Sequence, residues 1–211
     1  MYLFTRRTRL TGGDGAAGVT WAASIATKVK EVTGQEIELW GTVYSPGFGT
    51  ISWTGWFEDL ASLETVGDKL QGDSGMEKLA NAGTKHTDGL LDDGLLQPIY
   101  GVPDPSVPSQ YVGGAVAVAA AGNIERAMSA GIEIAQKSEK LTGLTTMFVR
   151  SMTGPYGAVG WLTGYENITA MEKAEDKLGA DASWLKLIDS TKGCFVEDPA
   201  LTQATIYRRL A

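Results

Sequence analysis

The stretch Trp53-Thr54-Gly55-Trp56-Phe57-Glu58-Asp59-Leu60 decides the fold, because it returns in altered form as Trp161-Leu162-Thr163-Gly164-Tyr165-Glu166-Asn167-Ile168. The two stretches lie 108 positions apart, and the same spacing continues on both sides of them without a gap. One spacing held over so many positions predicts that the chain contains one unit twice. The further identities are Gly49/Gly157, Glu64/Glu172, residues 68–70 and 176–178, Asp73/Asp181, and residues 78–79 and 186–187.

Each of the two stretches ends a predicted β-hairpin. Glycine and proline cluster at Pro46-Gly47-Phe48-Gly49 and at Gly154-Pro155-Tyr156-Gly157, between runs rich in β-branched and aromatic residues. Such clusters are typical of the tight turns that join antiparallel strands. The predicted hairpin strands are 36–45 with 50–58, and 144–152 with 158–166.

Working outward from the hairpins, each half shows the same order of elements. A strand (3–10 or 112–120) precedes a helix (18–32 or 124–141) that ends at Thr33-Gly34 or Thr142-Gly143, where glycine suits the left-handed cap. After the hairpin, Asp59 or Asn167 supplies an N-cap for a second helix, and a short helix and a last strand follow. The order βαββαβ is that of the ferredoxin-like fold. The shorter elements are expected at 76–82 and 184–189 (helices) and at 95–100 and 202–208 (strands).

A proline-rich connector separates the halves. Four of the seven prolines lie in residues 97–110, and proline fixes φ and removes a backbone donor. We therefore expect a first repeat at 1–100, a linker at 101–110 and a second repeat at 111–211. Because both helices of a βαββαβ unit cover one sheet face, two units can bury their open faces against each other. The predicted fold is α+β, with two tandem ferredoxin-like units that form one pseudo-dimeric α/β barrel.

The hairpin followed by an aromatic and acidic strand end and a helix resembles the dimeric α/β-barrel superfamily. Within it, the chain is similar to NIPSNAP-like and antibiotic-biosynthesis-monooxygenase-like proteins, and the likeness covers nearly the whole chain at the level of element order. The resemblance implies two facing ferredoxin-like units, here fused in one chain. It leaves the activity open, since the superfamily includes cofactor-independent oxygenases, haem enzymes and members without an assigned activity.

Composition excludes several classes of protein. One cysteine and one histidine cannot build a structural zinc site or an internal disulfide. A net charge of −7 and a pI near 4.8 argue against binding to nucleic acid or an anionic membrane. No run approaches the roughly 18 to 20 apolar residues of a membrane span, and the N-terminal residues lack a signal-peptide pattern. We expect a cytoplasmic protein without a metal, whose outer faces leave room for a homo-oligomer.

Strand alternation suggests where a ligand would bind. In the strand 36–45 one face carries Glu38, Trp40, Thr42 and Tyr44, and the 108-residue spacing puts Thr146, Phe148, Arg150 and Met152 on the matching face. Large aromatic side chains with isolated charges suit a small-molecule cavity. The catalytic candidates are Glu38, Tyr44 and Arg150, and the ligand-binding candidates are Trp40, Thr42, Phe148 and Met152. The alternative is that Trp40 and Phe148 fill a core while Glu38 and Arg150 lie in solvent.

The remaining candidates have simpler interpretations. Trp53 and Trp161 share an apolar stripe and are expected in the core under the helices. His86 and Cys194 lie 108 positions apart, and His86 is a haem ligand only if a haem binds; its polar, glycine-bounded surroundings favour an exposed loop. The arginines at the outer strands are expected to be solvated charges that discourage edge pairing, rather than an anion site: Arg6, Arg7, Arg9, Arg208 and Arg209.

Three functions follow from these observations. The first is a cofactor-independent monooxygenase-like enzyme that binds a small aromatic or polyketide-like molecule in the barrel. The second is a non-catalytic, NIPSNAP-like ligand-binding or scaffold protein. The third is a haem-binding barrel protein that uses His86.

Overall fold

The computed structural model describes residues 1–11 and 15–211. Its elements follow the order strand, helix, strand, strand, helix, helix, strand, and this order occurs twice. The first set comprises β1 (Tyr2–Arg9), α1 (Gly15–Thr33), β2 (Glu38–Val43), β3 (Thr50–Phe57), α2 (Leu60–Gln71), α3 (Ser74–Ala82), the 3-10 helix η1 (Gly83–Lys85) and β4 (Asp92–Tyr100). The second set comprises β5 (Tyr111–Val118), α4 (Ile124–Thr142), β6 (Thr146–Ser151), β7 (Ala158–Tyr165), α5 (Ile168–Ala180), α6 (Ala182–Ser190) and β8 (Gln203–Arg209).

Hydrogen bonding orders the strands of the described residues as β1-β3-β2-β8-β5-β7-β6-β4, which closes as a barrel. A mixed helix and strand fold with a closed antiparallel barrel is thus confirmed. The chain divides into two compact units, one of Met1–Leu95 with Arg208–Ala211 and one of Leu96–Tyr207. The first unit ends before the expected boundary at residue 100, and it takes up the last residues of the chain.

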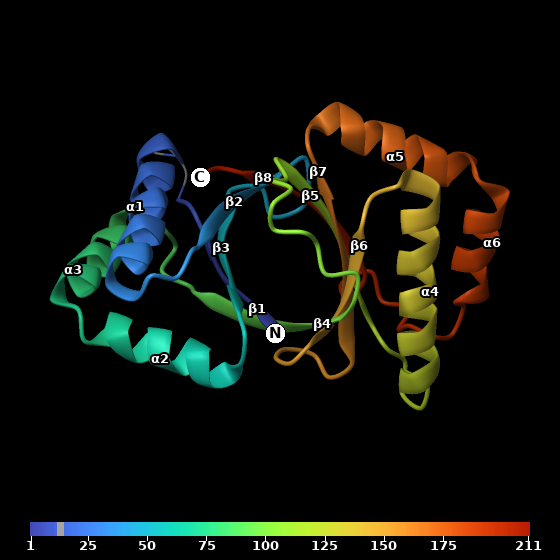
Figure 1. Ribbon diagram of the computed structural model, residues 1–211, viewed down its shortest axis with the longest axis horizontal. Helices are drawn as coiled ribbons and strands as arrows, with labels where there is room; N and C mark the ends of the chain where they lie inside the picture. Colours follow the sequence, from blue (N-terminus) through green and yellow to red (C-terminus); the bar gives the residue numbers. More distant parts are fainter. Residues whose placement is uncertain (12–14) are drawn as a thin grey trace. The chain divides into compact units, whose positions relative to one another are not determined.

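In the first unit, β3 lies between β1 and β2, and α1, α2 and α3 lie to one side of these strands (Figure 1). Trp53 is opposite Leu39 on β2, and Ile51 is opposite Gly41. Leu39, Ile51 and Trp53 pack with Ala22 of α1 in one buried cluster. The face of β3 that carries Ile51 and Trp53 is therefore the face that the helices cover.

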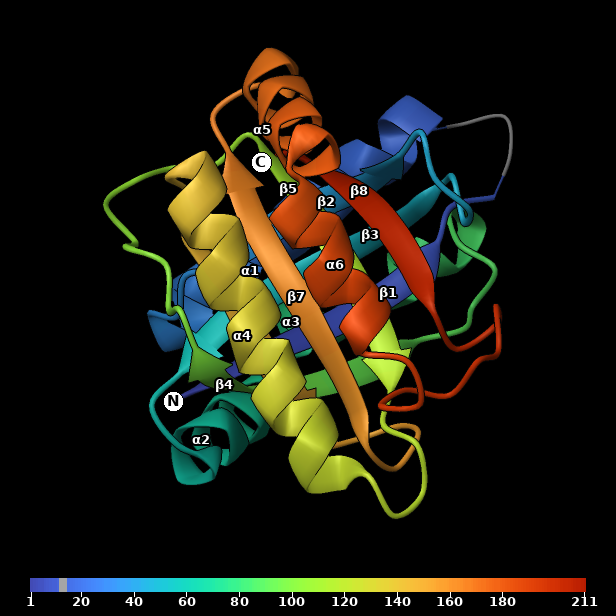
Figure 2. The ribbon, with the colours of Figure 1, turned by 90° about the vertical axis from the view of Figure 1, so that its right-hand side faces the viewer.

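In the second unit, β7 lies between β5 and β6, and Figure 2 shows α4 and α6 in front of these strands. Trp161 on β7 is opposite Phe148 on β6, and Phe148 packs with Ala135 of α4 in a buried cluster. The arrangement of strands and covering helix matches that of the first unit.

The two tryptophans make the same hydrogen bond in their own units. The indole Nε1 of Trp53 donates to the carbonyl oxygen of Ala22 in α1 at 2.9 Å, and Nε1 of Trp161 donates to that of Gly131 in α4 at 2.9 Å. Trp53 is buried under α1, as predicted, whereas Trp161 is partly buried and packs against the core cluster under α4. An indole N–H that is removed from water needs such a partner.

Local sequence signals place the element ends correctly. Asp59 and Asn167 accept a hydrogen bond from the backbone N–H of Ser62 and Ala170, as N-caps do. Gly143 ends α4 in the left-handed conformation with φ 78°. Along the chain, each hairpin therefore follows the first helix of its unit and precedes the second.

The spacing of the repeat changes by one residue at the hairpins. Trp53 and Trp161 are equivalent residues that lie 108 positions apart in the chain. Leu39 is opposite Trp53 and Phe148 is opposite Trp161, so Leu39 and Phe148 are also equivalent, but they lie 109 positions apart. The first hairpin therefore contains one residue more than the second. Because successive strand residues point to opposite faces, this single residue reverses the faces that a constant spacing of 108 assigns to β6.

We predict that Gly131→Ala destabilises the protein by about 1–3 kcal/mol, because a Cβ at residue 131 would lie 2.2 Å from the Phe148 ring. The control is Gly67→Ala in α2, where a Cβ meets no atom within 4 Å and should stabilise the helix by about 0.5–1 kcal/mol. Urea unfolding followed by circular dichroism measures both. Equal effects of the two substitutions would contradict the close helix–strand contact.

Candidate functional site

The face of the first unit's strands that the helices do not cover is rich in polar residues. Trp40 is opposite Ser52, which is opposite Arg7, and Glu38 is opposite Thr54, which is opposite Thr5. Opposed residues point to the same side of a sheet, so these side chains form continuous rows. We call this surface the polar face; its members are Thr5, Arg7, Arg9, Glu38, Trp40, Thr42, Thr50, Ser52 and Thr54.

A charged pair and an aromatic ring occupy the β2 end of the polar face. Arg209 forms an ion pair with Glu38, and its guanidinium carbon lies 5.0 Å from the centroid of the Trp40 ring. Trp40 is 6% exposed, and its Nε1 donates to Thr54 Oγ1 at 3.1 Å. The ring and both charges are thereby held in a fixed arrangement on one side of β2.

Arg209 reaches this position because the end of the chain runs along β2. The backbone N–H of Leu210 donates to the Leu39 carbonyl oxygen at 2.8 Å, and Leu210 packs on the helix-facing cluster. Neighbouring residues of an extended segment point to opposite sides, which directs Arg209 to the polar face.

Ser52 supplies a buried hydroxyl without a partner. It is 4% exposed, and among the described residues its Oγ makes no hydrogen bond. It lies between Trp40 and Arg7 in the middle row of the polar face. Buried polar atoms are nearly always hydrogen-bonded, so an unpaired one in a polar row is typical of a place that receives a ligand or water.

A hollow of about 260 Å³ lies beside β1 at the other end of the polar face. Asp92 across the hollow pairs with Arg7. Thr8 also borders the hollow, but it is opposite Ile51, so its buried side chain lies on the helix-facing side of β1. The complete lining is Arg7, Thr8, Arg9, Thr50, Asp88, Leu90 and Asp92. Three of these residues, Arg7, Arg9 and Thr50, belong to the polar face, so the hollow opens on its β1 end.

The structure brings together three of the predicted residues of the first half. Glu38, Trp40 and Thr42 lie on the polar face, and Thr42 is buried. Tyr44 follows the end of β2, is 81% exposed and has a φ of 51°. It lies in the hairpin loop, so its position gives it no part in this row of side chains.

The predicted residues of the second half lie elsewhere. Phe148 is fully buried between Trp161 and α4, so the expectation that it lines a ligand cavity is wrong, and the cause is the one-residue change in the spacing of the repeat. Arg150 is exposed, and its Nε donates to Gln97 Oε1 at 2.7 Å. Met152 lies in the loop after β6 and is exposed, and Thr146 hydrogen-bonds Thr163 inside the second unit.

The second unit does not repeat the polar face. At the corrected spacing Trp40 is equivalent to Val149 and Glu38 to Met147, while Ser52 is equivalent to Gly160. The equivalents of Arg7, Thr5 and Thr54 are Val116, Gly114 and Leu162. Polar residues on this face are thus a property of the first unit, although both units share the same helix-facing core.

His86 and Cys194 occupy matching positions in their units. Each precedes a residue that bridges to the end of the first strand, Thr87 to Leu10 and Phe195 to Ala119. The His86 ring is half-buried, with its centroid 6.1 Å from that of the Trp21 ring, rather than exposed as expected, and Cys194 is buried. The described residues contain no group of three His, Cys, Asp or Glu side chains that could hold a metal ion.

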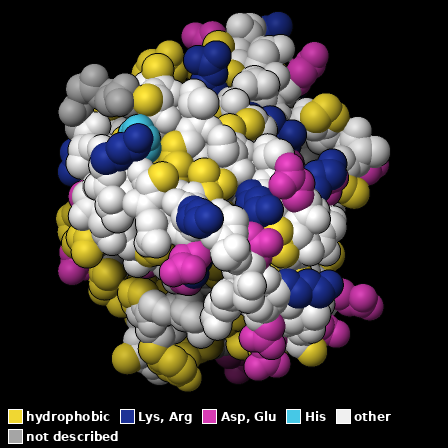
Figure 3. Space-filling view, turned by 90° about the vertical axis from the view of Figure 1, so that its left-hand side faces the viewer, with side chains coloured by type: hydrophobic (Ala, Val, Ile, Leu, Met, Phe, Trp, Pro, Cys, Tyr) yellow, Lys and Arg dark blue, Asp and Glu magenta, His cyan; other side chains and the backbone are white. Residues whose placement is uncertain are grey.

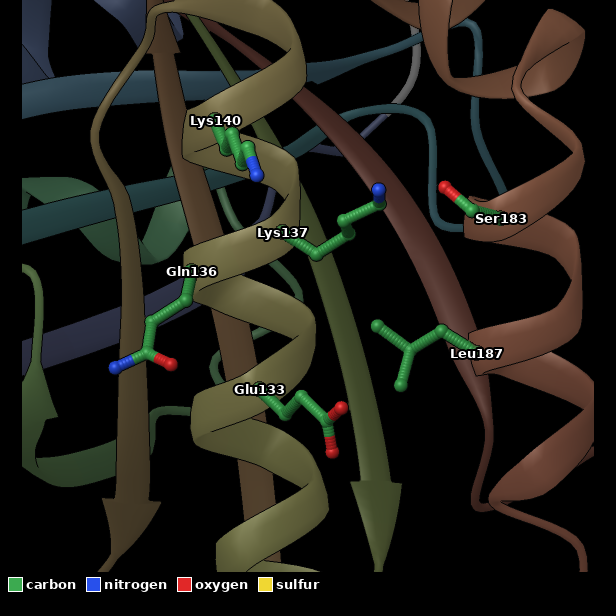
Figure 4. A pocket seen from close by; sticks show the side chains of 6 residues that line it. All are labelled: Glu133, Gln136, Lys137, Lys140, Ser183 and Leu187. Carbon is green, nitrogen blue, oxygen red and sulfur yellow. The ribbon is translucent and has the colours of Figure 1, made fainter.

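A second hollow, of about 330 Å³, lies between α4 and α6 (Figure 4). Figure 4 shows Lys137 of α4 extending toward α6, and its Nζ is 3.9 Å from Asp181, which caps that helix. Its other lining side chains are Glu133, Gln136, Lys140, Ser183 and Leu187. Because Lys137 is engaged with Asp181 and no unpartnered buried polar atom of the described residues lies here, we place the candidate site on the polar face.

On the helical side of the first unit, acidic and basic side chains are interspersed (Figure 3). No large patch of one charge is visible on this side. Within residues 1–11 and 15–211, no helix combines the length and apolarity that crossing a membrane requires.

Arg209 and Ser52 are the two site residues that the sequence interpretation missed. Arg209 was assigned to solvated edge charges, because its contact with β2 joins residues far apart in the chain. A signal for Ser52 was present: Thr50, Ser52 and Thr54 alternate with Ile51, Trp53 and Gly55, which is the pattern of a strand with one polar face.

The chain was also compared with known proteins. No protein-family model matches it, and no curated protein matches its sequence. Several solved structures align over nearly the whole chain. They include a "putative monooxygenase" from Fusobacterium nucleatum (TM-score 0.71, 9% identity, 100% of this chain and 92% of that one), a "putative monooxygenase" from Lactobacillus acidophilus (0.66, 10%, 100% and 94%), and an "anthrone oxidase-like protein" (0.67, 10%, 99% and 90%). At such low identity the likeness shows the fold alone, and this fold is the one that the sequence resemblance implies.

The strongest pKa shift lies away from the polar face. Burial, with the nearby Glu175 charge, raises the pKa of Tyr165 to about 12. In the unfolded chain this tyrosine ionises near pH 10, before it does so in the folded protein. The stability that the protonated hydroxyl contributes is therefore complete below pH 10 and is lost as the pH rises toward 12.

We expect Tyr165→Phe to reduce the fall in unfolding free energy between pH 10 and 12, as measured by urea titrations. An unchanged slope would refute this, and Tyr156→Phe at an exposed position is the control.

The Glu38–Arg209 pair should contribute modestly to stability. Both side chains are partly exposed, so we expect a coupling energy of about 1 kcal/mol or less in a double-mutant cycle of Glu38→Gln and Arg209→Gln. Urea unfolding of the four proteins measures the coupling. Strictly additive effects would mean that the two charges do not interact in solution.

Proposed function

We propose that the protein is a cofactor-independent monooxygenase-like enzyme whose first unit binds a small aromatic molecule on the polar face. The observation that carries this proposal is the combination of a buried tryptophan, a charged pair and an unpartnered serine hydroxyl on one strand face. Such a mixture of an aromatic wall and a few fixed polar groups is typical of small-molecule sites. The names of the structural neighbours, which include monooxygenase and anthrone oxidase-like, point to the same class of reaction.

We also interpret the two sets of elements as tandem ferredoxin-like units. The strand order contains the series β4-β1-β3-β2 and β8-β5-β7-β6, and the two series are related by the repeat. Each series has the first and third strands at its centre. This is the arrangement expected of two βαββαβ units in one chain.

Each group of the polar face has a defined task in this proposal. The Trp40 ring packs against the aromatic substrate, and the Glu38 carboxylate accepts a proton from an acidic C–H group of that substrate. Arg209, which lies over Trp40 and beside Glu38, stabilises the negative charge that develops on the substrate oxygen. Ser52 donates its hydroxyl hydrogen to the same or a neighbouring oxygen.

The resulting substrate anion passes electrons to dioxygen and forms a carbon–oxygen bond. For an anthrone, the methylene group becomes a carbonyl group, one oxygen atom of O₂ enters the product, and the other leaves as water. This reaction needs no electron donor besides the substrate. The protein's task is therefore to remove a proton and to stabilise the anion.

Oxygen uptake with anthrone as substrate tests the proposal. We expect the protein to accelerate oxygen consumption and the appearance of anthraquinone absorbance, and Glu38→Gln to lower kcat/KM at least about tenfold because the base is lost. Glu36→Gln is the matched control, since Glu36 lies on the same segment but pairs with Lys30. Loss of activity in both variants, or in neither, would contradict the role of Glu38.

The alternatives give different results in the same assays. Binding of the aromatic molecule without oxygen uptake would support a non-catalytic, NIPSNAP-like ligand-binding protein. A Soret band in the purified protein that disappears in His86→Ala would support haem binding instead. In that case the haem ligand would be His86, which is partly buried beside Trp21.

A further inference from the structure

We infer that the aromatic molecule bound on the polar face carries a second acceptor oxygen, and that Ser52 and Arg7 bind this oxygen together. This inference rests on the proposed function, since it narrows the class of substrate to ring systems with oxygen atoms on two sides. It makes Arg7 a further binding residue, on the side of Ser52 that faces away from Trp40.

Ser52 provides the first donor of this oxygen site. Its hydroxyl lies on the polar face, is closed to solvent and makes no hydrogen bond among residues 1–11 and 15–211. A buried hydroxyl without a partner costs free energy, so an acceptor from outside the chain would relieve that cost.

Arg7 provides the second donor on the same face. It is opposite Ser52 in the antiparallel pair of β1 and β3, so the two side chains leave neighbouring strands on the same side of the sheet. Its Nη2 donates to Asp92, and its other nitrogens donate to none of the residues that the structure describes. By contrast, Arg6 donates to Asp93 through both Nε and Nη2, at 2.8 and 2.7 Å. Arg7 therefore keeps donors that a ligand oxygen can use.

The second unit shows how closely the neighbours of Ser52 approach it in this row. Gly160 occupies the equivalent position there, and a Cβ on it would lie 3.6 Å from the Val116 side chain and 3.4 Å from that of Val149. Apolar contacts thus fill the row in the second unit. The first unit has a ring, a hydroxyl and a guanidinium in the same three places, which suits an oxygenated aromatic molecule.

The hollow beside β1 gives access to the oxygen site. It is lined by Arg7 and by Thr50, which precedes Ser52 by two residues and lies on the same face of the sheet. Because Ser52 is closed to solvent, a molecule from the hollow reaches it past Arg7. The side chains of Arg7 and Asp92 are 44% and 68% exposed, so their ion pair is weak and Arg7 can turn to a ligand at little cost.

The strand spacing indicates where the two oxygen atoms of the ligand lie. Ser52 is one strand away from Trp40, and Arg7 is two strands away, at about 4.8 Å a strand. Arg209 is beside Trp40 at the β2 end of the face. A ring system with oxygen atoms on opposite sides, such as a para-quinone or its keto and phenol precursor, can contact Arg209 with one oxygen and the Ser52 and Arg7 donors with the other.

Isothermal titration calorimetry with two inert probes tests the inference. 2,3-Dimethyl-1,4-naphthoquinone has a carbonyl oxygen on both sides of its ring, and 2,3-dimethylchromone has the same outline with a ring ether in place of one carbonyl. We expect the wild-type protein to bind the quinone about five- to tenfold more tightly, because a carbonyl oxygen is the better acceptor for a charged donor and a hydroxyl. This preference should fall below about threefold in Ser52→Ala and in Arg7→Met, and disappear in the double variant.

Arg6→Met is the matched control, because it makes the same change at the adjacent residue of β1. Arg6 is opposite Trp53 on the helix-facing side and pairs with Asp93, so the preference for the quinone should remain. Equal loss of the preference in Arg6→Met and Arg7→Met would overturn the inference, since a general charge effect would then suffice.

Urea unfolding separates binding from a structural role of Ser52. Because its hydroxyl has no partner, Ser52→Ala should leave the free energy of unfolding unchanged or raise it. Thr54→Val is the comparison, and it should lower the free energy of unfolding, because Thr54 accepts a hydrogen bond from Trp40. A Ser52→Ala protein that is less stable and binds both probes more weakly by the same factor would contradict the oxygen site.

The titrations also distinguish failure of this inference from failure of the proposed function. If the wild-type protein binds both probes equally well, the second oxygen site is wrong while the aromatic site stands. If neither probe binds, the proposed aromatic site fails, and the oxygen site fails with it.

Discussion

The hydrogen bond from a strand tryptophan to a helix carbonyl is the constraint on which the rest of the structure depends. In each unit the indole N–H reaches the first helix, at Ala22 or at Gly131. The bond fixes the strand face that the helix covers, and Gly131 also leaves room for the Phe148 ring beside it. Once Trp53 points to the helix, alternation places its neighbours Ser52 and Thr54 on the other face.

The same constraint explains why the charged groups of the first unit lie where they do. Arg209 can pair with Glu38 because Leu210, the next residue, packs among the helix-facing side chains. The position of a charge near the end of the chain thus follows from the burial of an apolar neighbour. A partly buried ion pair contributes little net stability, and for this reason the role proposed for the pair beside Trp40 is in ligand binding.

Much of the fold could be predicted because its signals are local. The capping residues Asp59 and Asn167, the glycine ends of the helices and the hairpin turns all depend on neighbouring residues. The site was harder to predict, because the face of Phe148 depends on one additional residue in the first hairpin and because Arg209 meets Glu38 from the far end of the chain. A long-range contact of this kind leaves no periodic pattern in the sequence.

The difference between the two units argues for a site in the first one. Both units must keep the tryptophan, the small helix residue and the apolar strand face, because these pack the helix on the strands. The opposite face is also buried, but its residues differ between the units: Trp40 and Ser52 of the first unit correspond to Val149 and Gly160 of the second. Polar side chains are costly to bury, and the second unit shows that the architecture does not need them. Their presence in one unit alone is therefore the reason for placing the proposed site on this face of the first unit.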